Sequence, residues 1–367
     1  MKHLITLRRT LPRVALLVFL VPISFFLFFT KGSSLWLFVT SALSILGLVV
    51  IIGKATEEIA LYMGPVWGGL LNATFGNITE LIIAFMALQS GMIEIVRASI
   101  TGSILGNLLL LLGLAMIAGG LKHKTQTFSR TGAVVNISML SLTLVALVIP
   151  ALAQLSPRLD PHFTALMADS MASKISLAIS VVLLVIYALS LLFSLGTHRF
   201  AFMPEKLEEE KPKWGKWFSV VVLSVIVVLV AFVSDFFVEA IDHLVRVQHI
   251  PISELFIGVV IVAIVGNAAE GSVAITVARQ NKMELAFQVA MGSCIQVALL
   301  VAPVLVIASH LIGKPMTLGF NIFEIAAIWA GVLIASTALQ DGESNWFEGA
   351  MMVGVYVVFA AVFFIHP

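Results

Sequence analysis

Charge and cysteine are both scarce in this sequence. Charged residues make up 11% of the 367 residues, whereas an average soluble domain contains about 25%. The single cysteine, Cys294, excludes an intrachain disulfide and any metal site built from several cysteines, and we expect it to be a small packing residue. The net charge of +1 indicates no nucleic-acid partner.

Hydrophobic sequence is abundant: 60% of the residues are hydrophobic, and the mean hydropathy is +1.09. These values predict an all-α integral membrane protein embedded in the lipid bilayer. The basic N-terminus resembles a signal peptide but lacks a small-residue cleavage site, so we expect the first span to be retained. Apolar windows predict about eleven transmembrane helices, at residues 14–30, 35–53, 66–88, 93–119, 132–153, 172–195, 217–238, 255–278, 284–309, 321–339 and 346–365.

The distribution of lysine and arginine between the predicted loops indicates the orientation. With the N-terminus in the cytoplasm, the cytoplasmic segments hold 15 of the 21 basic residues and the other side holds 6. Cytoplasmic loops of membrane proteins carry an excess of basic residues. We therefore expect a cytoplasmic N-terminus, an external C-terminus and a cytoplasmic linker at residues 197–216.

Two acidic residues interrupt otherwise apolar spans. Glu80 is the only charged residue between positions 66 and 88, and Glu270 is the only one between positions 255 and 278. An ionisable residue within a membrane span is costly and indicates a functional site. The alternative is a structural acid paired with a neighbour, which is disfavoured because neither span contains Lys or Arg.

The two acids occur in the same pattern. Gly-Asn-x-x-Glu at 76–80 recurs at 266–270, and the same offset of 190 relates the Gly-Ser pair at 102–103 to the pair at 292–293. Spans two to six and seven to eleven then form two inverted five-helix repeats, because an odd number of helices reverses the orientation. The predicted domains are a tail and peripheral helix (1–33), a first repeat (34–196), an acidic linker (197–216) and a second repeat (217–367).

This architecture and composition predict an oxygen-lined site near the middle of the membrane. Inverted repeats with interrupted helices at the midplane are typical of secondary transporters, although the glycines would also permit close helix packing. On a continuous helix, Asn77 and Glu80 would share one face, as would Asn267 and Glu270. Carboxylate, amide and backbone oxygens suit Ca²⁺, and these spans contain no His or Cys ligand for zinc or copper.

The same two carboxylates would also carry protons, because burial and a neighbouring acid both favour the protonated form. Competition between Ca²⁺ and H⁺ would then couple the two ions. Hydroxyl and amide groups of the following spans are further candidates, unless they only form interhelical hydrogen bonds. The candidate cation set is Glu80, Glu270, Asn77, Asn267, Gly76, Gly266, Gln296, Ser103, Ser293 and Asn107.

Other acids flank the predicted site and are vestibule candidates that would gather cations or relay protons, or else ordinary solvated residues. For Asn72 and Thr74 we expect packing or helix capping, and for Glu324 and Glu348 structural roles. The vestibule candidates are Glu57, Glu58, Glu239, Asp242 and, in the linker, Glu205, Glu208, Glu209 and Glu210.

These motifs resemble those of the Ca²⁺/H⁺ antiporters of the cation exchanger family, part of the wider cation/Ca²⁺ exchanger superfamily. The resemblance implies one peripheral helix before two inverted five-helix repeats, cation and proton exchange at Glu80 and Glu270, and a site lined by Asn77, Asn267 and Gln296. It implies no cofactor, since Ca²⁺ is the substrate, and the acidic linker resembles the segment that joins the two halves. The segments that carry the resemblance are 55–58, 72–82, 102–109, 266–270, 292–296 and 341–349.

The sequence also departs from the family pattern. Ile78 replaces an alanine that is frequent in the first motif, a change we expect to be tolerated, and Gly271 stands where a histidine is frequent, so a role for that histidine is not carried over. The linker is less acidic than in some members. The short N-terminal tail lacks the regulatory extension of plant members, which favours a bacterial plasma membrane. The sequence leaves open whether the chain forms a homo-oligomer.

The sequence bears on four classes of function. The leading one is a secondary antiporter that exchanges cytosolic Ca²⁺ for external H⁺ by alternating access. A Na⁺/Ca²⁺ exchanger of the same superfamily is the alternative; Gln296, an amide rather than an acid, favours protons without deciding between the two. A passive cation channel would also use midplane acids, but broken helices in inverted repeats disfavour it. An intramembrane enzyme is rejected because Asp235 has no obvious aspartate partner and His243 and His249 fall in a predicted loop.

Overall fold

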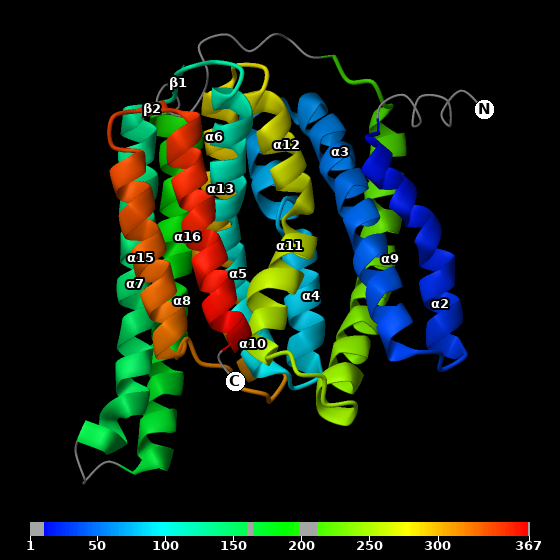
Figure 1. Cartoon of the computed structure of the whole chain (residues 1–367), viewed down its shortest axis with the longest axis vertical. Helices are drawn as coiled ribbons and strands as arrows, with labels where there is room; N and C mark the ends of the chain where they lie inside the picture. Colours follow the sequence, from blue (N-terminus) through cyan, green and yellow to red (C-terminus); the bar gives the residue numbers. More distant parts are fainter. Residues whose placement is uncertain (1–10, 160–163, 199–210, 366–367) are drawn as a thin grey trace.

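The computed structural model describes residues 11–159, 164–198 and 211–365, and its long helices lie side by side in one array (Figure 1). The first half contains η1 (Arg13–Leu20), α2 (Val21–Phe29), α3 (Ser34–Phe75), α4 (Ile78–Gln89), α5 (Ile93–Leu105), η2 (Gly106–Leu111), α6 (Leu112–Gly120), β1 (Gln126–Thr127), α7 (Arg130–Leu159), α8 (Ala165–Leu191) and η3 (Leu192–Thr197). The second half contains α9 (Lys216–Asp242), η5 (His243–Val247), α10 (Glu254–Phe256), η6 (Ile257–Val262), α11 (Ala263–Gly266), α12 (Ala268–Ala278), α13 (Met283–Gln296), η7 (Val297–Val301), α14 (Ala302–Leu311), α15 (Ile322–Ala338), β2 (Glu343–Ser344) and α16 (Trp346–Ile365).

Each predicted apolar span has a helical counterpart. Within the described residues, seven continuous helical stretches are long and apolar enough to cross a membrane, and the bent pair Glu254–Gly266 and Ala268–Ala278 makes an eighth if it is counted as one span. The apolar helices Arg13–Phe29, Ile78–Gln89 and Ile322–Ala338 are shorter. The helical fold class is confirmed, while the count of eleven membrane crossings stays a prediction.

The longest helix, α3, consists of two arms joined at Gly64. Gly64 has φ 78° and ψ 174°, a backbone conformation that glycine adopts without steric cost. A Cβ added to Gly68 would lie 2.7 Å from the carbonyl oxygen of Ala60, so the second arm lies close to the first. The prediction that this span ends at residue 53 is wrong. Ion pairs of Lys54 with acids three and four residues later support the helix beyond residue 53, whereas a hydropathy window stops at charges.

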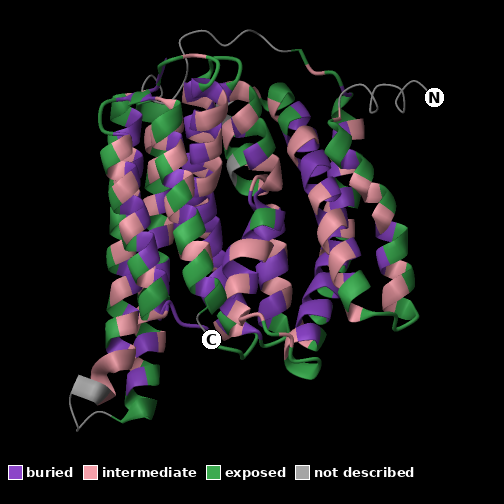
Figure 2. Cartoon of the chain, in the orientation of Figure 1, coloured by how far each residue is buried: buried purple, intermediate pink, exposed green. Residues whose placement is uncertain are grey.

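Burial separates central helices from outer ones (Figure 2). In their most apolar windows, Ile93–Gly120 is 83% buried and Met283–Leu311 is 72% buried, whereas Ala165–Thr197 is only 22% buried. The outer helices expose apolar side chains such as Val181 and Val225. Such a surface is stable against lipid, and the Gly-Ser motifs lie on the two most buried stretches.

The helix α2 lies at the edge of the array, beside α3 (Figure 1). The rings of Phe25 and Phe28 pack on Phe236 of α9, with centroids 4.9 and 4.1 Å apart. The Ser24 hydroxyl lies 3.3 Å from that of Ser44 in α3. The N-terminal helix is therefore packed on the outside of α3 and α9.

Two loops at one end of the array are joined by a short antiparallel pairing of β1 with β2, in which Gln126 faces Ser344. The Gln126 side chain donates to the Ala278 carbonyl oxygen at 2.9 Å and to Asn281 Oδ1 at 3.0 Å. The pairing therefore ties the α6–α7 and α15–α16 loops to the end of α12. Two-residue strands leave no periodic pattern, so sequence analysis did not predict them.

Candidate functional site

Two helix breaks, one in each Gly-Asn-x-x-Glu motif, lie inside the helix array (Figure 1). Gly76 and Asn77 separate α3 from α4, and Asn267 separates α11 from α12, whose axes differ by 59°. Asn77 has φ −101° and ψ 20°, and Asn267 has φ −87° and ψ 11°, so both adopt similar non-helical conformations. Each Asn is the residue before the helix that carries the Glu, so the two do not lie on one continuous helix; that their side chains share a face stays a prediction.

The breaks place each glutamate in the first turn of a new helix, Glu80 in α4 and Glu270 in α12. Unpaired backbone N–H groups give a helix N-terminus a partial positive charge, which stabilises nearby carboxylates. Local backbone geometry thus supplies part of the stabilisation that a missing Lys or Arg would otherwise give.

The Glu80 side chain reaches from the first motif to the second. A Cβ added to Gly266 would lie 2.9 Å from Glu80 Cγ, so only a glycine leaves room for this contact. Glu80 is 8% exposed, and both its carboxylate oxygens are buried without a hydrogen-bond partner among the described residues. Burial of an unpartnered polar group is unfavourable, so these oxygens are free to bind a proton or a cation.

Glu270 is half-buried, and its Oε2 is likewise buried and unpartnered within the described chain. Its carboxylate interacts electrostatically with that of Glu80. Two like charges held close together in an apolar interior repel one another strongly. A positive charge placed between the two carboxylates would relieve this repulsion.

Hydrogen-bonded side chains extend from the break at Asn267. Its Nδ2 donates to Ser103 Oγ at 3.2 Å, and its Oδ1 accepts from Asn107 Nδ2 at 2.8 Å. The same Asn107 nitrogen donates to Ser293 Oγ at 2.9 Å. The Oδ1 atom of Asn107 is buried without a partner in the described part of the chain, so it remains available as an oxygen ligand.

The chain of hydrogen bonds continues to the other break. Ser293 Oγ donates to Asn77 Oδ1 at 2.9 Å, and Asn77 Nδ2 donates to Gln296 Oε1. The amide and hydroxyl groups that the sequence suggested are thus brought into one connected network together with both breaks. The hydrogen bonds fix the amide orientations, and their role as cation ligands stays a prediction.

The network pairs matching Asn and Ser residues twice, with opposite directions: Asn267 donates to its serine, whereas Asn77 accepts from its serine. Asn267 of the second motif bonds to Ser103 of the first half, and Asn77 of the first motif bonds to Ser293 of the second half. A π-helical segment follows each Gly-Ser pair, η2 after the first and η7 after the second. Local π-helical segments are frequent at functional sites.

The vestibule candidates of α3 have different surroundings. Glu57 is exposed and pairs with Lys54 at 3.0 Å, whereas the Glu58 side chain is 1% exposed and pairs with the same Lys54 at 3.1 Å. Glu58 Oε2 also accepts from the backbone N–H groups of Lys213 and Trp214, at 2.7 and 2.9 Å. Glu58 is therefore not an open acid at the mouth, because it anchors the last part of the linker.

The remaining vestibule candidates lie away from the breaks or outside the described residues. Glu239 is exposed in the last turns of α9, and Asp242 forms an ion pair of 3.1 Å with Arg246. The expectation that His243 lies in a loop is wrong, since it begins η5 and its Nδ1 lies 2.9 Å from Ser34 Oγ. The linker acids Glu205, Glu208, Glu209 and Glu210 lie outside the described residues.

Glu324 and Glu348 both occupy helix-capping positions, as their predicted structural roles require. Glu324 forms a capping box with Asn321 and accepts from Thr101 Oγ1 at 3.0 Å. Glu348 Oε2 accepts from the backbone N–H of Asn345, whose own side chain accepts from the Glu348 N–H. Both carboxylates therefore cap the N-termini of their helices, α15 and α16.

Sequence reasoning missed Ser99, which lies with Glu80 and Ser103 around a small cavity. Ser99 precedes Ser103 by four residues, and this spacing places both hydroxyls on one face of α5. This four-residue spacing in the sequence could have identified Ser99 as a neighbour of Ser103. Thr79, buried and without a partner for its hydroxyl among the described residues, was also missed, and only its position beside Glu80 would have indicated it.

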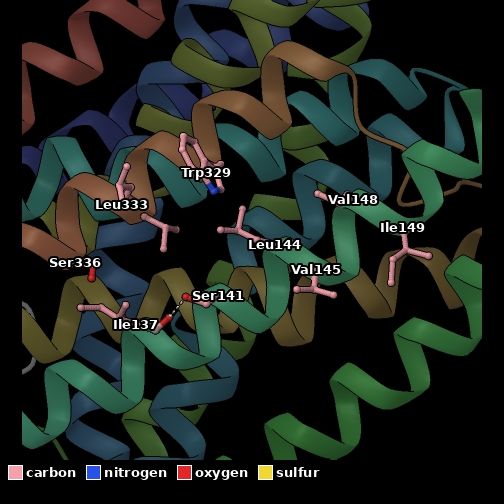
Figure 3. Close-up of a pocket in the computed structure, with 10 residues that line it drawn as sticks. Ile137, Ser141, Leu144, Val145, Val148, Ile149, Trp329, Leu333 and Ser336 are labelled. Carbon is pink, nitrogen blue, oxygen red and sulfur yellow. Dashed lines mark hydrogen bonds between the residues drawn. The ribbon is translucent and has the colours of Figure 1, made fainter.

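A larger cavity of about 440 Å³ lies between α7 and α15 (Figure 3). Its walls include Val145, Ile149, Trp329 and Leu333, which are apolar and partly exposed on outer helices. Its lining contains no carboxylate. It is therefore unsuited to a cation, and the smaller polar region at the breaks is the candidate ion site.

The ligand chemistry at the breaks fits a hard cation. Among the described residues, no group of three or more His, Cys, Asp or Glu side chains is arranged to hold a metal ion. Any cation there depends on two carboxylates supplemented by amide, hydroxyl and backbone oxygens. Such mixed oxygen shells are typical of Ca²⁺.

Comparisons with known proteins agree with these features. The Ca²⁺/H⁺ antiporter of Aphanothece halophytica is 41% identical over 366 residues, covering 96% of each chain. The Ca²⁺/H⁺ antiporter ChaA of Bacillus subtilis is 42% identical over 334 residues, covering 90% of this chain and 92% of the relative. The solved structure of native YfkE superposes with a TM-score of 0.82 at 37% identity, covering 96% of this chain and 100% of that one.

A family model described as sodium/calcium exchanger protein matches this chain in two blocks, residues 33–196 and 218–365. Each block contains one Gly-Asn-x-x-Glu break and one of the two Gly-Ser pairs related by the offset of 190. With this coverage, and with relatives above 40% identity along nearly the whole chain, the chain belongs to the sodium/calcium exchanger protein family.

Proposed function

We propose that this integral membrane protein is a secondary antiporter that exchanges cytosolic Ca²⁺ for external H⁺ at Glu80 and Glu270. The observation that carries the proposal is the contact of Glu80 with Gly266, which brings a carboxylate with two unpartnered oxygens against the opposite break and into interaction with Glu270. The antiporter relatives that match nearly the full chain support the same exchange.

Charge balance supplies the coupling. Two ionised carboxylates carry a charge of −2, which one divalent cation or two protons neutralise. The unloaded dianion is unfavourable in a medium of low dielectric constant, so the site changes its exposure between membrane sides mainly when loaded. The same carboxylate oxygens bind either Ca²⁺ or protons. Ca²⁺ is therefore released from the site only when protons take its place.

The surrounding residues divide into ligands and orienting groups. Ca²⁺ takes six to eight oxygens, and we assign Glu80, Glu270 and the free Oδ1 of Asn107 to this shell. Backbone oxygens at the two breaks complete it. The network of Asn77, Asn267, Ser103, Ser293 and Gln296 holds these groups in place.

The proposed architecture is eleven transmembrane helices, with residues 1–33 as tail and peripheral helix, inverted repeats at 34–196 and 217–367, and a cytosolic acidic linker at 197–216. The two blocks of the family match and the reciprocal bonds of Asn77 and Asn267 support this division. Alternating access would arise from movement of one repeat against the other around the site. We assign the protein to a bacterial plasma membrane, with the N-terminus inside and the C-terminus outside.

The test is Ca²⁺ uptake into proteoliposomes under an imposed pH gradient or an imposed Na⁺ gradient. The pH gradient is expected to drive uptake and the Na⁺ gradient to have no effect. Uptake driven by Na⁺ alone would overturn the proton assignment and establish a Na⁺/Ca²⁺ exchanger.

The site assignment is tested with Glu80→Gln and Glu270→Gln. Each removes one charge while keeping the side-chain size, so transport driven by the pH gradient is expected to fall at least about 100-fold, the range of a lost charge stabilisation of roughly 3 kcal/mol. Glu343→Gln, at an exposed position in β2, removes the same charge away from the site and is expected to transport normally. Normal exchange by either site variant would exclude its glutamate from the mechanism.

A further inference from the structure

A small cavity adjoins Glu80 and is lined by residues of α4, α5, η6 and η7. Its volume is about 10 Å³, which is close to the space that a single water molecule requires. The residues that line it are Glu80, Ala84, Ser99, Ile100, Ser103, Val262, Val297 and Val301.

The polar atoms of this cavity complement one water molecule. Ser99 Oγ donates to the Val96 carbonyl oxygen at 2.8 Å, which leaves its oxygen free to accept. Ser103 Oγ accepts from Asn267, and its own hydrogen has no acceptor among the residues described. Glu80 presents two oxygens without a partner in the described chain. A buried water needs two to four polar partners, and three are present.

We propose that Ser99 is a positioning residue for the transported cation and acts through one water molecule held between Ser99, Ser103 and Glu80. The water donates its hydrogens to Ser99 Oγ and to one Glu80 oxygen, and it accepts from the Ser103 hydroxyl. One lone pair of the water then remains for the cation, which Glu80 binds through its other oxygen. The inference rests on the proposed Ca²⁺ site at Glu80.

This arrangement makes the two halves unequal. The residue 190 positions after Ser103 is Ser293, but the residue 190 positions after Ser99 is Val289, which has no hydroxyl. The water is therefore held on the Glu80 side, and Ca²⁺ accepts it because its flexible shell mixes protein and water oxygens. A site with only two carboxylates needs such additional oxygens to complete its shell.

Three substitutions test the role of Ser99. Ser99→Ala removes the acceptor of the water, and the KM for Ca²⁺ is expected to rise roughly 3- to 10-fold with a nearly unchanged maximal rate, the effect of losing one hydrogen bond. Ser99→Val also fills the cavity and is expected to raise KM further. Ser99→Thr keeps the hydroxyl and is expected to restore KM to within about twofold of the wild-type value.

The matched control is Ser180→Ala in α8, which also removes a buried hydroxyl bonded to its own helix, at 2.7 Å from the Ser176 oxygen. Ser180→Ala is expected to leave KM unchanged. A purely structural role for Ser99 would lower thermal stability and the amount of active protein without shifting KM, and threonine would not selectively restore affinity. Wild-type KM in both Ser99→Ala and Ser99→Val would overturn the proposal, and Ser99→Ala decides alone if the valine variant does not fold.

Equilibrium ⁴⁵Ca²⁺ binding to the same variants in lipid nanodiscs separates this inference from the proposed function. Weaker binding by Ser99→Ala supports the inference even if wild-type protein shows no uptake driven by a pH gradient, which would refute proton coupling alone. Unchanged binding by both variants, alongside active wild-type transport, refutes only the role of Ser99. Wild-type protein that binds no Ca²⁺ would refute both.

Discussion

Adjacent residues of one helix can have opposite energetic roles, and Glu57 and Glu58 in α3 are such a pair. Successive helical positions point about 100° apart, so one carboxylate faces solvent while its neighbour is buried. Glu58 binds Lys54 and two backbone N–H groups in the last part of the linker, whereas Glu57 only pairs with Lys54. Sequence analysis identified both acids but treated them alike, because the partners of Glu58 lie 155 residues away.

We predict that Glu58→Ala lowers the free energy of unfolding by about 3 kcal/mol, at the lower end of the range for breaking a buried ion pair, since Lys54 keeps Glu57 as a partner. Glu57→Ala is expected to change stability by less than about 1 kcal/mol, as exposed ion pairs usually do. Thermal unfolding of the two purified variants in detergent measures the difference. Equal destabilisation would contradict the anchoring role of Glu58.

Individual site residues were predictable where a charged side chain interrupts an apolar span. Glu80 and Glu270 are visible because a carboxylate is rare in an apolar span. The orientation of Asn77 and Asn267 was not predictable, since spacing rules assume a continuous helix and both residues lie in breaks. The hydrogen bond between Asn107 and Asn267 joins residues 160 positions apart, which a single sequence does not reveal.

At the scale of elements, two glycines that match in sequence differ in their packing. A Cβ on Gly102 in α5 would lie 2.1 Å from the carbonyl oxygen of Val259 in η6, so these two backbones are in direct contact. A Cβ on Gly292 in α13, at the matching position, would meet no atom within 4 Å. The repeat in sequence therefore does not extend to identical helix packing.

Gly102→Ala is predicted to destabilise the protein by roughly 1–3 kcal/mol, because the clashing atom belongs to the backbone and the helices must separate. Gly292→Ala is predicted to be neutral or stabilising by up to about 1 kcal/mol, since alanine favours a helix more than glycine does. Expression level and thermal unfolding in detergent compare the two. A stable Gly102→Ala variant would show that α5 and η6 are not tightly packed.

Hydropathy predicted where the helices lie, but it did not predict where they end. Each apolar span became helical, yet α3 passed its predicted end to reach the turn at Gly64, and the sharp bend at Asn267 divides one predicted span. Helix ends depend on caps, turns and local ion pairs, which contribute little to an averaged hydropathy. The β1–β2 pairing depends entirely on contacts between distant loops.

At the scale of the whole molecule, the proposed membrane crossings assign the two ends of the array to opposite sides of the membrane. The α6–α7 loop and the η5–α10 loop lie at opposite ends in Figure 1. Lys124 and Gln248 are exposed in these two loops. With the N-terminus inside, Lys124 is assigned to the cytoplasm and Gln248 to the external side.

The native cysteine makes this assignment testable by labelling. Cys294 is buried and its Sγ lies 3.6 Å from the Ile104 carbonyl oxygen, so a membrane-impermeant thiol reagent is not expected to modify it. In intact cells, Gln248→Cys is predicted to react and Lys124→Cys to react only after the membrane is permeabilised. The wild-type protein is the unlabelled control. The reverse pattern would invert the orientation and hence the direction of Ca²⁺ export, whereas labelling of both variants in intact cells would contradict the proposed number of crossings between the two loops.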